Sequence, residues 1–126
     1  MNLLLITSKL IEESEQCIKR FEQMRVEDRA PDFFEEVKPH VQLVDELIQN
    51  WRELSLAYIQ QYKPKYVHVS QINAAEEGMK QYIVQSFYKE TSKKRFYQSV
   101  HAVLYTLKTL QTELESDKHD SDLSIT

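Results

Sequence analysis

The stretch Pro39–Tyr62, PHVQLVDELIQNWRELSLAYIQQY, contains the chain's only tryptophan and its clearest helical pattern. Apolar and small side chains recur across it at alternating spacings of four and three residues, which is the repeat of an amphipathic helix with one buried face. Leu47, Leu54 and Ile59 broaden that face. The buried face itself begins just before the quoted stretch and consists of Val37, Val41, Val44, Ile48, Trp51, Ser55, Tyr58 and Tyr62. The pattern predicts a long scaffold helix with Trp51 as a core anchor.

Pro39 lies inside this pattern. A proline within a helix removes one hydrogen bond and clashes with the preceding turn. Either a short helix ends at Lys38, or one helix is kinked at Pro39. We favour the kink, because the apolar spacing that begins at Val37 continues without a shift beyond the proline.

Three further amphipathic segments accompany this one. They run from about Leu3 to Asp28, from about Gln71 to Tyr88, and from Thr91 or Ser92 to near Glu115. Asp32, Ser70 and Thr91 or Ser92 are residue types that suit helix N-caps. Four such segments with short connections predict an all-α fold, an antiparallel up-down-up-down four-helix bundle.

Length and composition fit this fold. A chain of 126 residues is one domain with a real core, and one glycine in that length disfavours tight hairpins and phosphate-binding loops. We expect the bundle to occupy residues 1–116. Residues 117–126 are polar, acidic and aperiodic, so we expect a flexible tail there.

The connections carry opposite charges. The first holds an acidic cluster around Asp28 and Glu36, and the third holds Lys89 followed by Lys93, Lys94 and Arg95. In an up-down bundle these two connections lie at the same end. The basic run is therefore interpreted as partners for the acidic loop rather than as a phosphate site.

Charge and hydropathy restrict the partners. The formal net charge of −4 comes from residues 113–126, and the remaining 112 residues sum to zero, which argues against nucleic-acid binding. No apolar run reaches the roughly 20 residues of a membrane span. Cys17 is the only cysteine, which favours the reducing cytoplasm. Its place on an apolar stripe predicts a buried small hydrophobe rather than a reactive thiol.

Several short motifs occur in a familiar order. They are Pro31-Asp32-Phe33-Phe34, Glu36-Val37-Lys38-Pro39, Trp51, Lys63-Pro64-Lys65-Tyr66, Val84-Gln85-Ser86-Phe87-Tyr88 and Lys93-Lys94-Arg95-Phe96. Over roughly residues 5 to 115 the chain resembles the YppE-like family, small uncharacterised proteins of Gram-positive bacteria related to Bacillus. The resemblance implies a four-helix bundle. It brings no activity, cofactor or catalytic residue.

The sequence contains no familiar catalytic or metal-binding pattern. Di-metal bundles use Glu-x-x-His pairs, and none occurs before His40, His68, His101 or His119. Glu36 and His40 are four residues apart, but one pair is not a metal site. No Gly-x-Ser-x-Gly elbow is present either. We therefore predict no catalytic residue, no metal and no cofactor, and a protein that is not an enzyme.

Aromatic residues are the most suggestive feature for binding. Tyrosine combines a large apolar surface with a polar tip, which suits interfaces as well as the ends of a core. The candidate interaction surface lies at the two ends of the predicted bundle, with Tyr58, Tyr62 and Tyr66 at one end and Tyr88, Lys93, Lys94, Arg95 and Tyr97 at the other. The leading hypothesis is a module that binds another protein or a second copy of itself.

Gly78 supports the alternative. It lies in the middle of the third helix, where glycine costs roughly 1 kcal/mol relative to alanine. It marks either the close approach of a neighbouring helix or bound group, or a tolerated surface position. The alternative function is thus a small-ligand pocket between the helices near Gly78 and Trp51.

Overall fold

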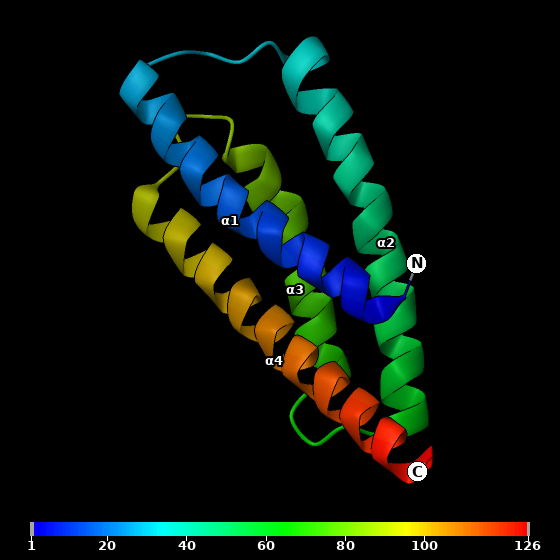
Figure 1. The fold of residues 1–126 in the computed structure, drawn as a ribbon. Coiled ribbons are helices and arrows are strands. Elements are labelled where there is room, and N and C mark those ends of the chain that lie inside the picture. The colour runs from blue at the N-terminus through cyan, green and yellow to red at the C-terminus, as the bar shows by residue number, and fades with distance from the viewer. Residues whose placement is uncertain (1, 126) are drawn as a thin grey trace.

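The computed structural model describes the backbone of residues 2–125 and the side chains of residues 2–116. Within that range the chain forms four α-helices, α1 (Leu3–Glu27), α2 (Lys38–Tyr62), α3 (Val69–Gln85) and α4 (Lys93–Ile125), and one short π-helix, η1 (Phe33–Val37). Successive helices run in opposite directions in Figure 1. The all-α four-helix fold predicted from the sequence is confirmed.

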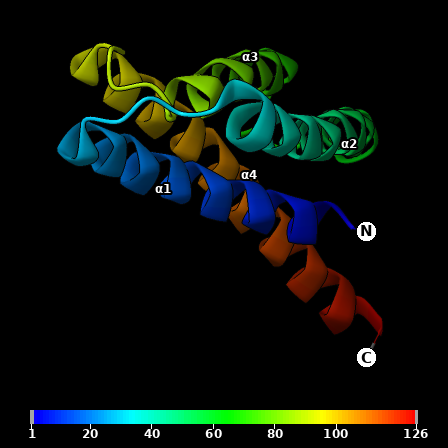
Figure 2. The same ribbon diagram turned by 90° about the horizontal axis from the view of Figure 1, so that it is seen from above.

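The helices do not lie parallel along their whole length. Figure 2 shows α2 and α3 side by side, with α4 crossing from the α3 side toward the α1 side. In Figure 1, α1 and α2 diverge toward the end where the first connection joins them. This end is where polar side chains of three helices meet, as described below.

The core contains most of the predicted faces. Trp51 is fully buried, and its indole Nε1 donates a hydrogen bond to Thr7 Oγ1 at 3.2 Å. Its largest fully buried neighbours in the core include Tyr82, Phe21, Phe96, Ile48, Met79, Leu107 and Leu110. Tyr62 departs from the prediction, because this residue at the end of the α2 pattern is 58% exposed.

The segment before Pro39 is a π-helix. The backbone N–H of Lys38 bonds to the carbonyl of Phe33, and Pro39 occupies the first turn of α2. A proline there removes an N–H that α2 itself does not use. The helical backbone thus passes through Pro39 without a break, and the wider turn η1 stands directly before it, where we expected a kink within one α-helix.

The helix ends follow the expected capping chemistry in two of three cases. Asp32 Oδ1 accepts the backbone N–H of Glu35 at 3.0 Å, and Ser92 Oγ accepts that of Arg95 at 3.4 Å. The third helix begins earlier than predicted, with His68 rather than Ser70 as its N-cap. The Gln71 side-chain oxygen accepts a hydrogen bond from the backbone N–H of His68 at 2.7 Å, which satisfies this N–H at the start of α3.

The first and third connections meet at one end, as the charge pattern predicted. Lys89 Nζ lies 2.6 Å from Asp28 Oδ1, and Arg25 donates to the carbonyl oxygens of Lys89 and Thr91. The run Lys93–Arg95 is different. Among the side chains that the structure describes, no acidic partner lies within ion-pair distance of these three residues.

Gly78 marks a close approach of α3 and α4. A Cβ built on Gly78 would lie 2.8 Å from Cγ2 of Val103, closer than real Cβ contacts allow. Val103 is buried and its branched side chain is stiff. The space beside Gly78, where a ligand pocket was the alternative prediction, is therefore occupied by Val103.

Gly78→Ala tests this packing. Alanine raises helix propensity by up to about 1 kcal/mol, but overpacking costs about 1–3 kcal/mol, so we expect a net loss of about 1 kcal/mol in the free energy of unfolding. In a Val103→Ala background the clash is gone, and the same substitution should be neutral or stabilising. Urea denaturation measures both. An equal loss in the two backgrounds would rule out the close approach as its cause.

The C-terminal helix is longer than expected. α4 is described through Ile125, beyond the predicted end near Glu115. The side chains of residues 117–126 lie outside the described part, so the acidic tail stays a prediction. Over the described residues, no helix has the length and apolarity needed to cross a membrane.

Candidate functional site

The eight residues predicted as an interaction surface fall into two groups at opposite ends of the bundle. Tyr58, Tyr62 and Tyr66 lie where α2 joins α3, and the other five lie around the connection from α3 to α4. Figure 1 shows these two connections at opposite ends. The eight residues therefore do not make one continuous surface.

The tyrosine end is only partly exposed. Tyr58 belongs to the core, and its ring lies 5.1 Å from that of Tyr62. Tyr62 and Tyr66 are 58% and 60% exposed, and Val69 beside them is 46% exposed. Two tyrosines and one valine thus remain open to a partner at this end.

The basic end is held by specific contacts. Tyr97, half-buried, donates its hydroxyl to Glu22 Oε1 at 2.6 Å, and this bond raises the pKa of the tyrosine. Lys93 Nζ lies 6.0 Å from the centre of the Tyr97 ring. Tyr97 therefore has a structural role between α1 and α4, whereas Lys93, Lys94 and Arg95 are exposed.

A polar network that sequence reasoning did not find joins α1, α2 and α3. Glu13 Oε2 lies 2.8 Å from His40 Nε2, 3.4 Å from an Arg20 guanidinium nitrogen, and 3.4 Å from the Cys17 sulfur. Arg20 also donates to Ser86 Oγ at 2.9 Å, and its guanidinium lies 4.5 Å from the centre of the Phe87 ring. No residue spacing reveals it, because its members come from three helices.

The network is not arranged for nucleophilic catalysis. A cysteine nucleophile needs a depressed pKa and a neighbouring base, usually a histidine. Cys17 is fully buried, its thiol faces the Glu13 carboxylate, and burial raises its pKa to about 12. The predicted burial of Cys17 is confirmed, and the imidazole of His40 is directed to the same carboxylate.

The raised pKa of Cys17 makes a testable prediction. The unfolded thiol loses its proton near pH 9 and the folded one near 12, so the folded state binds more protons in this window. The free energy of unfolding should therefore fall as pH rises from about 9 to about 12. Tyr82, whose pKa burial also raises, acts in the same direction. Cys17→Ala should flatten the slope of stability against pH, measured by urea denaturation. An unchanged slope would contradict the assignment.

Within residues 2–116, no group of three or more histidine, cysteine, aspartate or glutamate side chains is arranged to hold a metal ion. Glu36, which was considered with His40, instead pairs with Arg29 at 3.0 Å. His40 pairs with Glu13 on a different helix.

A second apolar stripe runs along α2 beside α1. Leu43, Leu47, Asn50 and Leu54 follow one another at spacings of four, three and four residues, so their side chains share one helix face. Leu43 is 62% exposed and Leu54 is 38% exposed, whereas Leu47 packs against the core. The sequence could have revealed this stripe, because each of its residues directly precedes a position of the buried face that includes Val44, Ile48 and Trp51.

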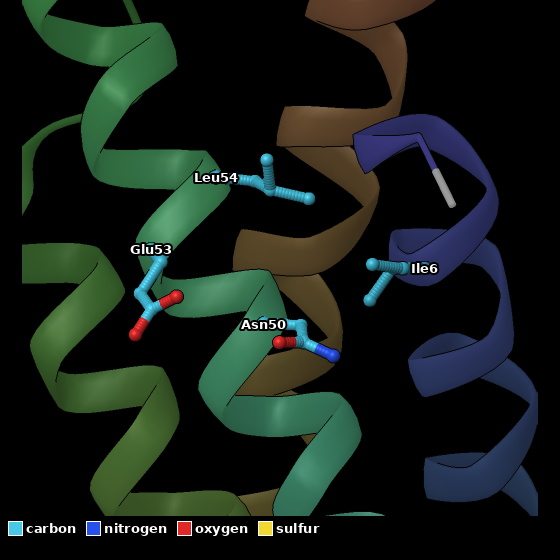
Figure 3. Close-up of a pocket in the computed structure, with 4 residues that line it drawn as sticks. All are labelled: Ile6, Asn50, Glu53 and Leu54. Atoms are coloured by element: carbon cyan, nitrogen blue, oxygen red, sulfur yellow. The ribbon is translucent and has the colours of Figure 1, made fainter.

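The stripe continues into a surface hollow of about 280 Å³ between α1 and α2, lined by Ile6, Asn50, Glu53 and Leu54. Figure 3 shows Ile6 of α1 and Leu54 of α2 pointing toward one another across it, while Glu53 points away from α1. We name this hollow, together with Leu43 and Leu47, the α1–α2 groove. It is an exposed apolar feature bordered by helices on both sides, which is the form of a helix-binding surface.

Residues 7–114 match a family described as "Bacterial domain of unknown function (DUF1798)". The chain belongs to this family. The resemblance to YppE-like proteins noted in the sequence is thereby confirmed. The DUF1798 match spans all four helices and includes most of the α1–α2 groove.

Solved structures of similar proteins show the same fold. The "Uncharacterized protein YppE" of Bacillus subtilis is 37% identical over 112 residues, 89% of this chain and 91% of that protein. Its crystal structure matches with a TM-score of 0.89 at 35% identity, covering 93% of this chain and 95% of that one. A Listeria innocua protein of unknown function matches with a TM-score of 0.89 at 23% identity, covering 94% and 95%, which shows the fold alone.

Proposed function

We propose that this protein is a non-enzymatic interaction module of the cytoplasm that binds another protein through the α1–α2 groove. The observation that carries the proposal is the stripe of leucines on α2 that the fold leaves partly open, with Leu43 at 62% exposure. Contiguous exposed apolar surface bordered by polar residues marks interaction sites. The lone Cys17, buried and unpaired, supports the reducing compartment.

The polar network supports a scaffold rather than a reaction centre. Its carboxylate, guanidinium and imidazole groups are directed at one another across α1, α2 and α3. They hold the diverging ends of α1 and α2 at a set distance. The alternative function, a ligand pocket near Gly78 and Trp51, receives no support from the packing, because Val103 fills that space.

Site-specific crosslinking in bacterial cells tests the proposal. A photo-reactive phenylalanine analogue replaces Asn50, which lies in the groove, or Glu77, which is exposed on α3 as a matched control. We expect a covalent adduct at position 50 that is absent at position 77. The adduct should disappear when Leu43→Ser and Leu54→Ser are added, since both leucines are accessible and their loss leaves the core intact.

The result also distinguishes a partner from self-association. An adduct whose second component is another copy of the chain would identify the protein as a dimer formed through the groove. Adducts of equal yield at positions 50 and 77, insensitive to the leucine substitutions, would contradict the groove as the binding surface. Mass spectrometry of the crosslinked peptides identifies both components.

A further inference from the structure

The edge of the α1–α2 groove that α2 forms is acidic. Glu46 and Glu53 are exposed there, and Arg52, the only lysine or arginine of α2 beyond Lys38, pairs with Glu76 of α3 at 3.3 Å. Over the described side chains, no cation lies within ion-pair distance of Glu46 or Glu53. Two carboxylates therefore border the leucine stripe without a cationic partner among the described side chains.

The opposite edge, formed by α1, differs in charge. Glu13 faces α2, because its carboxylate pairs with His40. Lys9 and Gln16 lie four residues before and three residues after Glu13, so they share that face of the helix. The groove thus has an acidic edge along α2 and a lysine on its α1 edge, with apolar side chains between.

We infer that the α1–α2 groove binds an amphipathic helix of a partner protein, with basic residues on the edge that faces α2. The inference rests on the proposed function and specifies its partner. Leu43 and Leu54 are eleven positions apart, about 16 Å at 1.5 Å per residue. An apolar stripe of three helical turns on the partner matches this length and meets the leucines at equivalent spacing.

Other occupants fit the groove less well. An extended peptide gains most of its affinity by pairing with a sheet edge, and the described backbone consists of helices and their connections. A second copy that docks its own groove about a two-fold axis across the groove brings like edges together, so Glu46 and Glu53 would face carboxylates. With the axis along the groove, the one lysine of the α1 edge, Lys9, would face both carboxylates. A basic helix removes that repulsion and supplies the missing cations.

Three synthetic peptides of about 18 residues serve as probes. The first carries leucines at spacings of four and three residues with lysines on one flank. The second has glutamates in place of the lysines, and the third has the composition of the first in an order that scatters the leucines. Fluorescence anisotropy at low and at physiological salt measures their affinities for the full-length protein. We expect the first peptide to bind at least about tenfold more tightly than the other two.

Charge reversal locates the binding surface. The double variant Glu46→Lys and Glu53→Lys should reverse the preference, so that the glutamate peptide binds more tightly. The matched control, Glu77→Lys and Glu90→Lys, changes the net charge equally at exposed positions away from the groove and should keep the original preference. Leu43→Ser with Leu54→Ser should weaken the lysine peptide more than about tenfold. Circular dichroism confirms that each variant is folded.

Two results would overturn the inference. One is equal affinity of the protein for the lysine and glutamate peptides. The other is the same loss of affinity for the lysine peptide in the double variant at Glu46 and Glu53 and in the control at Glu77 and Glu90, which would indicate nonspecific attraction to an acidic protein. If the crosslink at position 50 persists but its partner segment is not a basic helix, the inference fails and the proposed function stands. If no peptide binds and no crosslink forms, both fail.

Discussion

Trp51→Ala is expected to lower the free energy of unfolding by about 3–5 kcal/mol, the range for removing a large buried aromatic side chain. Trp51 has no exposed surface and lies among core residues from all four helices. Such a loss is a large part of the 5–15 kcal/mol that stabilises a typical domain. Urea denaturation followed by circular dichroism measures it, because the substitution removes the only tryptophan.

Two companion variants separate the packing of the indole from its hydrogen bond. Thr7→Val keeps the shape of the side chain but leaves the Trp51 N–H without its acceptor, which should cost about 1–3 kcal/mol. Trp51→Phe retains most of the buried ring and remains measurable if the alanine variant does not fold. A loss below about 1 kcal/mol for Trp51→Ala would contradict its place at the centre of the core.

Glu13→Ala is expected to cost about 2–4 kcal/mol, because it leaves Arg20 and His40 half-buried without their shared carboxylate. The Glu13 side chain is 14% exposed, so solvent replaces little of the lost interaction. Glu13→Gln keeps an oxygen acceptor and should cost less. Chemical denaturation at neutral pH gives the free energies of unfolding of the unchanged protein and of the two variants.

The adjacent residue provides the control for this network. Glu12 is exposed on the same turn of α1, and Glu12→Ala should change stability by no more than about 0.5 kcal/mol. A double-mutant cycle of Glu13→Ala with His40→Ala should give a coupling energy of at least about 1 kcal/mol. Equal effects of the Glu12 and Glu13 substitutions would show that the network does not stabilise the fold.

The network and the groove belong to one arrangement. Both depend on how α1 packs against α2, because Glu13 of α1 contacts His40 of α2 and the hollow lies between Ile6 of α1 and Leu54 of α2. A destabilised network should therefore also weaken peptide binding. This connection joins the stability of the scaffold to the proposed function.

Local pattern alone determined the helices of this protein. A four-three spacing marks a buried helix face wherever it occurs, so the faces containing Trp51, Phe21 and Leu107 were predictable. Two of the three predicted N-caps and the up-down order also follow from neighbours in sequence, which is why the meeting of Asp28 with Lys89 was predictable. These features follow from short-range patterns and from the rule that short connections make successive helices antiparallel.

Only the tertiary structure decided which polar side chains meet and which apolar ones remain exposed. Glu13 and His40 are 27 residues apart, and Arg20 and Ser86 are 66 apart, so no spacing along the chain predicts their contact. The role of Gly78 is visible only in its close approach to Val103, and the hollow at Leu54 is visible only once Ile6 is placed across from it. The physical reason is that a helix pattern specifies which face is apolar, whereas the angle between packed helices specifies how much of that face is covered.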